Sequence, residues 1–141
     1  RHASRQSLPD RPASDIRRRI QQTVEHIRLH FATPLTLSHL AELAGMSISH
    51  FSSNFRQYYH NSPIQFLISL RMAHARELLR NSNLSVTEIA RLCGFYSVQQ
   101  FSHLFRKRFG LSPGRFRFRQ DEPGSPTAFF QSGKESTSET K

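Results

Sequence analysis

Residues 84–116 read LSVTEIARLCGFYSVQQFSHLFRKRFGLSPGRF, and this stretch decides the fold. Gly94 separates two segments that both have a helical pattern of apolar residues. In the second segment Phe101, Phe105 and Phe109 recur every four residues, which places them on one face of a helix. The outward positions of this segment are polar or basic. This pattern predicts a helix that packs one side on a core and presents the other side to a polar, anionic partner.

The same pattern occurs once more, about fifty residues upstream. An offset of 49 aligns residues 35–46 with residues 84–95, including the glycine of each turn. One residue is then inserted in the later copy, and an offset of 50 aligns residues 47–66 with residues 97–116. Each copy has an alanine where two helices would cross closely, a turn glycine, a capping serine and buried aromatic anchors. The sequence therefore predicts two helix-turn-helix units.

Helix starts are marked by short polar residues. Ser85 and Ser97 are each followed three residues later by Glu or Gln, the pattern of a capping box. Ser62 precedes a proline at the first helical position, which predicts the start of a long helix over residues 63–80. An earlier apolar stripe predicts a first helix capped by Ser14.

These elements predict an all-α fold of about seven helices. Two helix-turn-helix subdomains, at about residues 14–62 and 81–119, are joined by the linker helix at 63–80. Residues 1–13 are polar, contain two prolines and show no periodicity, so we expect a flexible linker. Residues 120–141 are rich in Gly, Ser, Thr, Pro and charge, so we expect a disordered tail.

The charge balance indicates a polyanionic partner. The chain has 20 Lys and Arg against 10 Asp and Glu, and residues 14–119 alone hold 15 basic and 5 acidic residues. A basic folded core favours nucleic acid or an anionic membrane surface, and the plain alternative is a soluble basic protein. No apolar run approaches the length of a membrane span, so we expect no membrane partner.

Nothing in the sequence indicates an enzyme, a cofactor or a metal. The single cysteine, Cys93, excludes a disulfide framework and a cysteine metal site, and fits a reducing cytoplasm. Because Cys93 aligns with Ala44, we expect it to be a small buried residue. The eight histidines show no HExxH motif and no paired-ligand spacing. No acid–base pair and no glycine-rich phosphate loop is visible.

Four segments carry a family resemblance: IARLCGF (89–95), FSHLFRKRFGLSP (101–113), LAELAGMS (40–47) and PIQFLISLRMAHARELL (63–79). In them the chain resembles the DNA-binding domain of the AraC/XylS family of bacterial transcription regulators, over residues 15–119. The second copy carries family-specific motifs, and the first copy is looser. In the first copy Tyr59-His60-Asn61 stands where a glycine often precedes the Ser-Pro step.

The resemblance implies how such a domain works. Recognition helices at about residues 47–58 and 97–108 would enter neighbouring major-groove segments, one DNA turn or ~34 Å apart. The implied partners are double-stranded promoter DNA and, for the full protein, RNA polymerase. Members of the family usually carry a separate effector-sensing or dimerisation domain. Nothing in these residues looks like one, so we expect the sequence to be a fragment.

Outward positions on the two expected recognition helices are the candidate base-contacting residues. They are Ser49, Ser52, Ser53, Gln99, Gln100, Ser102 and His103. Gln99 is the strongest candidate because glutamine can pair bidentately with adenine, whereas Gln100 has a competing role as the partner of Ser97 in a capping box. The serines of the first helix are short, so we expect them mainly to position the helix. The alternative is that Asn54 or Gln57 reaches the DNA.

Basic residues near the ends of both helices are the candidate phosphate contacts. They are Arg56, Arg106, Lys107 and Arg108. An ion pair with a nearby acid is the competing interpretation. Arg115, Arg117 and Arg119 would add to the same positive field. A rival function is a helical protein-interaction module that binds an acidic partner, which would require a contiguous exposed apolar patch where the sequence has polar residues.

Overall fold

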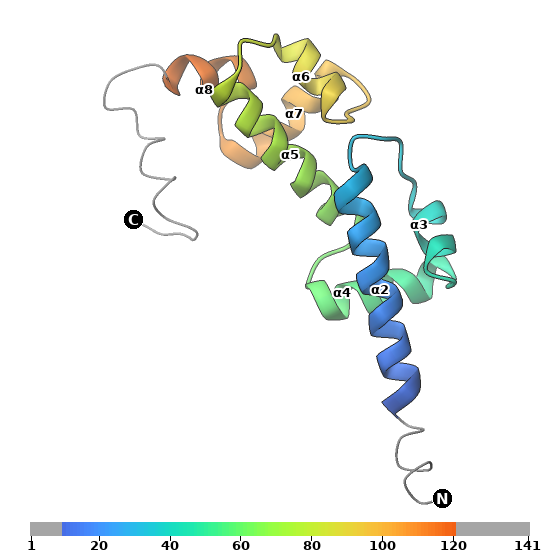
Figure 1. Cartoon of the computed structure of the whole chain (residues 1–141). Coiled ribbons are helices and arrows are strands. Elements are labelled where there is room, and N and C mark those ends of the chain that lie inside the picture. Colours follow the sequence, from blue (N-terminus) through green and yellow to red (C-terminus); the bar gives the residue numbers. More distant parts are fainter. Residues whose placement is uncertain (1–9, 121–141) are drawn as a thin grey trace, which may run out of the picture. The chain divides into compact units, whose positions relative to one another are not determined.

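The computed structural model describes residues 10–120, and this part of the chain is entirely helical (Figure 1). Its seven helices are α2 (Asp10–His30), α3 (Leu37–Leu43), α4 (Ile48–Tyr59), α5 (Pro63–Asn81), α6 (Val86–Leu92), α7 (Val98–Phe109) and α8 (Pro113–Gln120). The chain divides into two compact units, and the boundary between Arg71 and Met72 lies inside α5. We call these unit 1 and unit 2. The predicted all-α class and the number of helices are confirmed.

Helix α2 begins at Asp10, four residues before the expected start at Ser14. Pro12 lies in the first turn, where a backbone N–H has no acceptor within the helix, so proline does not interrupt the pattern there. Residues 10–13 of the expected linker are therefore helical. The remainder of that linker and the expected tail from residue 121 onward lie outside the described residues.

Unit 1 has a core made by one face of each of its helices. The buried side chains are Ile20, Val24, Ile27, Leu40, Ala41, Ala44, Phe51, Phe55 and Leu67. Phe51 and Phe55 are fully buried, as the spacing of the aromatic residues predicted. The ring of Phe55 also packs edge-on against Phe66, at 5.5 Å between ring centroids. The apolar stripe of α2 therefore holds α3 and α4 in place.

Unit 2 repeats this arrangement with the second half of α5 in the place of α2. Its buried side chains include Met72, Ala75, Leu79, Ile89, Ala90, Cys93, Phe95, Phe101, Phe105 and Phe116. Cys93 is fully buried, as expected from its alignment with Ala44. Helix α5 thus contributes Leu67 to one core and Met72 to the other. Its position between two repeats suggests a linker, but the helix contributes buried side chains to both units.

The two helix-turn-helix turns have the same backbone geometry. Gly45 and Gly94 have φ of 69° and 87°, the left-handed region in which glycine is favoured. The next residue in each turn donates its N–H to the carbonyl of an alanine five residues earlier, Met46 to Ala41 and Phe95 to Ala90, both at 3.0 Å. The repeat seen in the sequence is therefore a repeat of conformation.

Arginine side chains close the ends of two helices. In unit 1 Arg71 donates to the carbonyls of Phe31 at 2.6 Å and Thr33 at 2.9 Å, just after α2 ends. In unit 2 Arg117 closes the end of α5. It donates to the carbonyls of Leu78, Leu79, Ser82 and Leu84, at distances of 2.6–3.4 Å. Arg117 therefore holds the end of α5, and its positive charge still contributes to the field of unit 2.

Candidate nucleic-acid interface

The start of α7 is fixed by two polar side chains. The Ser97 hydroxyl accepts the N–H of Gln100 at 3.0 Å, as a capping box requires. The amide oxygen of Gln100 accepts the N–H of Tyr96, at 2.8 Å, and not that of Ser97. Among the helices of residues 10–120, the full capping box forms only at Ser85 and Glu88 of α6. Gln100 is thus occupied in locking the turn, and its oxygen has a partner inside the protein.

The exposed face of α7 combines an amide side chain with a cation. At about 100° per residue, His103 and Arg106 lie within about 40° of Gln99 around the helix axis. Gln99, His103 and Arg106 are all exposed, while Phe101 and Phe105 on the opposite side are fully buried. Ser102 is half-buried at the edge of this face. The aromatic anchors therefore fix which side chains α7 presents.

The three basic residues after Phe105 point in different directions around the axis of α7. Arg106 lies about 20° from Gln99 around the axis, Lys107 about 80° and Arg108 about 180°. All three are exposed. Arg106 alone shares the face of Gln99, and Arg108 lies on the side of the helix that carries the aromatic anchors. The helical turn thus separates residues that the sequence groups together.

Helix α4 presents a shorter and less charged face. Ser47 caps it by accepting the N–H of His50 at 3.1 Å. Ser49, Ser53 and Arg56 are exposed, and Ser52 is half-buried. The Asn54 amide donates to the carbonyl of His50 at 2.8 Å, so it is held against its own helix. Gln57 is exposed.

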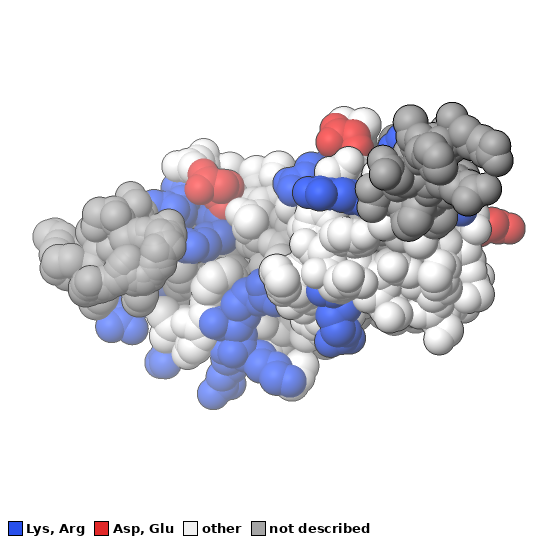
Figure 2. Space-filling model, turned by 90° about the horizontal axis from the view of Figure 1, so that it is seen from below, with Lys and Arg blue, Asp and Glu red and all other residues white. Residues whose placement is uncertain are grey.

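Positive charge is unequally shared between the units. Residues 72–119 contain nine Lys and Arg against two acids, whereas residues 14–71 contain six against three. Blue Lys and Arg side chains outnumber red acidic ones on the face in Figure 2. Within residues 10–120 no helix is long and apolar enough to cross a membrane. Unit 2, whose recognition-helix face has the longer polar side chains, also carries the larger excess of positive charge, which attracts polyanions.

Comparisons with known proteins agree with this geometry. A family model described as a helix-turn-helix domain matches residues 40–119. The HTH-type transcriptional regulator GbdR of Pseudomonas aeruginosa is 32% identical over 108 residues, which are 77% of this chain and 28% of that protein. The HTH-type transcriptional activator RhaS of Salmonella arizonae is 36% identical over 109 residues, 77% of this chain and 39% of RhaS.

A solved structure gives the link to DNA. The DNA-binding domain of the global transcriptional factor AdpA, solved in complex with a target DNA, superposes with a TM-score of 0.68. It is 33% identical in sequence, and the match covers 70% of this chain and 89% of that one. This chain belongs to the AraC/XylS family. The resemblance inferred from the sequence motifs is confirmed.

Members of the AraC/XylS family are transcription regulators, and this chain is a DNA-binding domain of that type. The comparisons do not favour the rival protein-interaction function. The chain spans between about a quarter and two fifths of the curated relatives cited above.

Two arrangements in this AraC/XylS domain escaped the sequence reasoning. The first supports the turn of unit 1. The Arg19 guanidinium donates to the carbonyls of Ala44 and Gly45, both at 3.4 Å, and pairs with Asp15 at 3.0 Å. Asp15 also accepts a hydrogen bond from Arg18, and this bond is the main cause of its lowered pKa. A run of three arginines gives no sign of which one faces the turn.

The second is a group of three histidines in unit 1. The ring of His26 lies 4.5 Å from that of His30 and 6.2 Å from that of His39, between centroids. Burial lowers the pKa of His26, and the charges of His30 and His39 lower it further. The four-residue spacing of His26 and His30 was a signal for this pair. Among residues 10–120, no set of three or more His, Cys, Asp or Glu side chains is placed to hold a metal ion.

Proposed function

We propose that α4 and α7 each enter the major groove of double-stranded promoter DNA, in adjacent segments about one turn, ~34 Å, apart. The observation that carries this proposal is the exposed polar face that each unit presents on the second helix of its helix-turn-helix. Within each unit, a capping serine and two buried phenylalanines determine which face of this helix is exposed. One chain would then recognise an asymmetric site.

Helix α7 does most of the sequence reading. Gln99 is the principal base contact because its amide offers a donor and an acceptor that match adenine N7 and N6. Ser102 and His103 add contacts to neighbouring edges. Gln100 contributes through its amide N–H₂ only, since its oxygen holds the turn at Tyr96.

Helix α4 mainly positions unit 1 on the duplex. Ser49, Ser52 and Ser53 have short side chains that suit backbone or water-mediated contacts. Arg56 and Arg106 bind phosphates at equivalent places in the two units, and Lys107 binds a phosphate next to Arg106. Arg108 contributes to the field without facing the bases.

The full protein would regulate transcription in the bacterial cytoplasm, where promoter DNA is found, and RNA polymerase would be its second partner. The support is the family and the name of RhaS, a transcriptional activator. A segment outside this chain would carry the effector or dimerisation function.

Selection of bound duplexes from a random DNA library tests the proposal. We expect two conserved segments about one helical turn apart, with more information in the segment bound by α7. Binding to the selected duplex should weaken steeply as salt rises, because neutralised phosphates release counterions. Equal affinity for selected and scrambled duplexes, or a salt slope near zero, would contradict DNA reading.

A further inference from the structure

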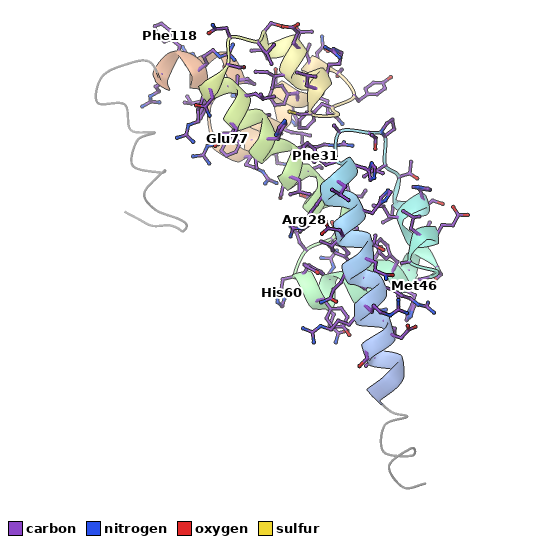
Figure 3. The ribbon with its side chains drawn as sticks, in the orientation of Figure 1. Arg28, Phe31, Met46, His60, Glu77 and Phe118 are labelled. Atoms are coloured by element: carbon purple, nitrogen blue, oxygen red, sulfur yellow. The ribbon has the colours of Figure 1, made fainter. Side chains whose placement is uncertain are left out.

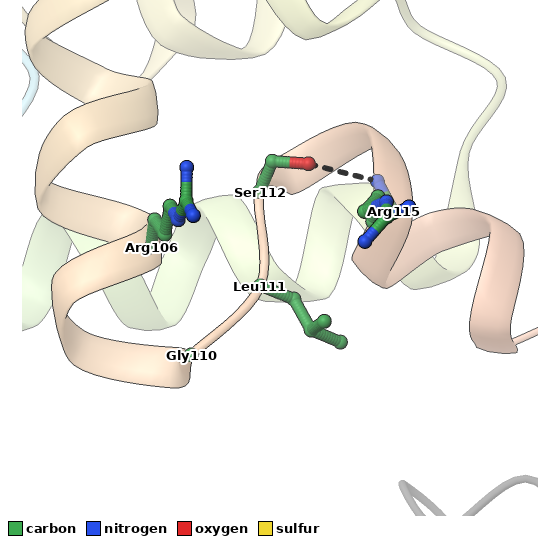
Figure 4. A pocket seen from close by; sticks show the side chains of 5 residues that line it. All are labelled: Arg106, Gly110, Leu111, Ser112 and Arg115. Atoms are coloured by element: carbon green, nitrogen blue, oxygen red, sulfur yellow. Dashed lines mark hydrogen bonds between the residues drawn. The ribbon is translucent and has the colours of Figure 1, made fainter.

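A hollow of about 320 Å³ lies at the corner between α7 and α8 in unit 2. It is lined by Arg106, Gly110, Leu111, Ser112 and Arg115. Figure 4 shows Arg106 on α7 and Arg115 on α8, on the two sides of the connection through Leu111 and Ser112. Two helices thus bring two arginines to one small concave surface.

The side chains at this hollow supply hydrogen-bond donors, and no acidic side chain that the structure describes neutralises their positive charge. Arg106 and Arg115 are both exposed, and no acid within residues 10–120 pairs with either guanidinium. The Ser112 hydroxyl accepts the backbone N–H of Arg115 at 3.3 Å. Its own proton therefore remains available to a ligand. Two guanidiniums and a hydroxyl match an anion that has several oxygens, such as a phosphate.

The hollow is also at the right distance from the base-reading side chain. Arg106 follows Gln99 by seven residues, which is about 10 Å along the helix and about 20° around it. The major groove is about 12 Å wide, so a helix that sets Gln99 against base edges places Arg106 near a bordering strand. The ligand that this position meets is the sugar–phosphate backbone.

We propose that the hollow formed by Arg106, Ser112 and Arg115 is the seat of one DNA backbone phosphate, and that it anchors unit 2 on the duplex. This inference rests on the proposed function, since it assumes that α7 enters the groove. The aligned corner of unit 1 lacks the second arginine. Its aligned residues are Arg56, Ser62 and Gln65, in which Gln65 donates its N–H to Ser62 at 3.1 Å, as Arg115 does to Ser112. The two corners share a backbone and differ by one cation.

The experiment compares Arg115→Gln with Arg119→Gln. Both variants remove one exposed arginine of α8, and only the first gives the corner the residue of unit 1. On the selected duplex, Arg115→Gln should make the negative slope of log K against log salt less steep by about 0.9. This corresponds to an affinity about eightfold weaker near 0.1 M salt. The loss should be equal on scrambled DNA. A loss no larger than that of Arg119→Gln overturns the phosphate seat.

Neutral methylphosphonates, placed one at a time along the duplex, locate the contact. At one position the substitution should weaken the wild-type chain clearly more than it weakens Arg115→Gln, which keeps only Arg106 and Ser112 as donors there. If every position weakens both proteins equally, no phosphate is held by Arg115 and the proposal is wrong. A wild-type chain that binds no duplex would instead refute the proposed function, so the two failures are distinguishable.

The reciprocal variant Gln65→Arg installs the missing cation in unit 1. It should make the slope of log K against log salt steeper by about 0.9. It should also add a second phosphate position at which a methylphosphonate weakens binding. An unchanged slope in Gln65→Arg, in a chain that folds normally by circular dichroism, would mean that two arginines at this corner do not make a phosphate site, and would overturn the proposal.

Discussion

The two units differ in backbone strain at His60, where unit 1 has a residue with a Cβ and unit 2 has a glycine. It ends α4 (Figure 3) with φ of 60° and ψ of 24°, and it is the one residue other than glycine with positive φ among residues 10–120. Gly110 ends α7 in the same way, with φ of 82°. The cap hydrogen bonds are equivalent, since His60 donates to Arg56 and Gly110 to Arg106, both at 2.7 Å.

Replacing His60 with glycine should therefore stabilise unit 1. The left-handed conformation costs a residue with a Cβ about 1–2 kcal/mol, and the greater backbone freedom of unfolded glycine offsets about 0.5–1 kcal/mol of this. The imidazole is exposed and has no hydrogen bond or ion pair within the described residues. The expected net gain is about 0.5–1 kcal/mol, or roughly 2–6 °C in the melting temperature.

The reciprocal change, Gly110→His, should destabilise unit 2 by a similar amount. A Cβ at Gly110 meets nothing within 4 Å, so the cost is conformational and not a clash. Urea denaturation followed by circular dichroism at 222 nm, as on any helical protein, measures both variants. His60→Ala is the control, because it removes the imidazole but keeps the Cβ. If His60→Gly is neutral or destabilising, the imidazole makes a favourable contact and the strain argument fails.

Three further predictions concern reading, capping and pH. Gln99→Ala should cost about 1–3 kcal/mol of DNA affinity and relax the preference at one base pair, measured by competition with single-base variants of the site; a uniform loss would contradict base reading. Arg117→Ala should lower the free energy of unfolding by about 2–3 kcal/mol, because four carbonyls lose a charged donor, whereas Arg119→Ala should change it by less than about 0.5. The pKa of His26 is lowered from 6.5 in the native state, so the unfolded chain takes up this proton first and stability should fall as pH drops below that value. Urea midpoints at about pH 7.5 and 5.5 measure this fall, and His26→Gln should reduce it.

Much of the local structure can be predicted from the sequence. The phenylalanine spacing, the turn glycines and the capping serines act over a few residues, and the structure places them as predicted. Their physical basis is short-range, because a cap, a left-handed turn and a helical stripe each depend on neighbours within about one or two turns. The repeat then determines that both units have the same fold.

The tertiary structure decided which polar residues are occupied within the protein. Arg117 looks like one member of a basic run, and only the end of α5 packed beside it makes it a cap for four carbonyls. Gln100 looks like a base reader until the turn brings the N–H of Tyr96 to its oxygen.

The stretch at 84–116 thus fixed its own helices and their exposed face. It did not determine that Arg106 and Arg115 line one hollow at the Ser112 corner. That pairing depends on the angle between α7 and α8, which is set by the packing of Phe105 and Phe109 on Phe116. Local sequence determines helices and caps because those interactions are local, whereas long side chains find their partners only after the core has packed.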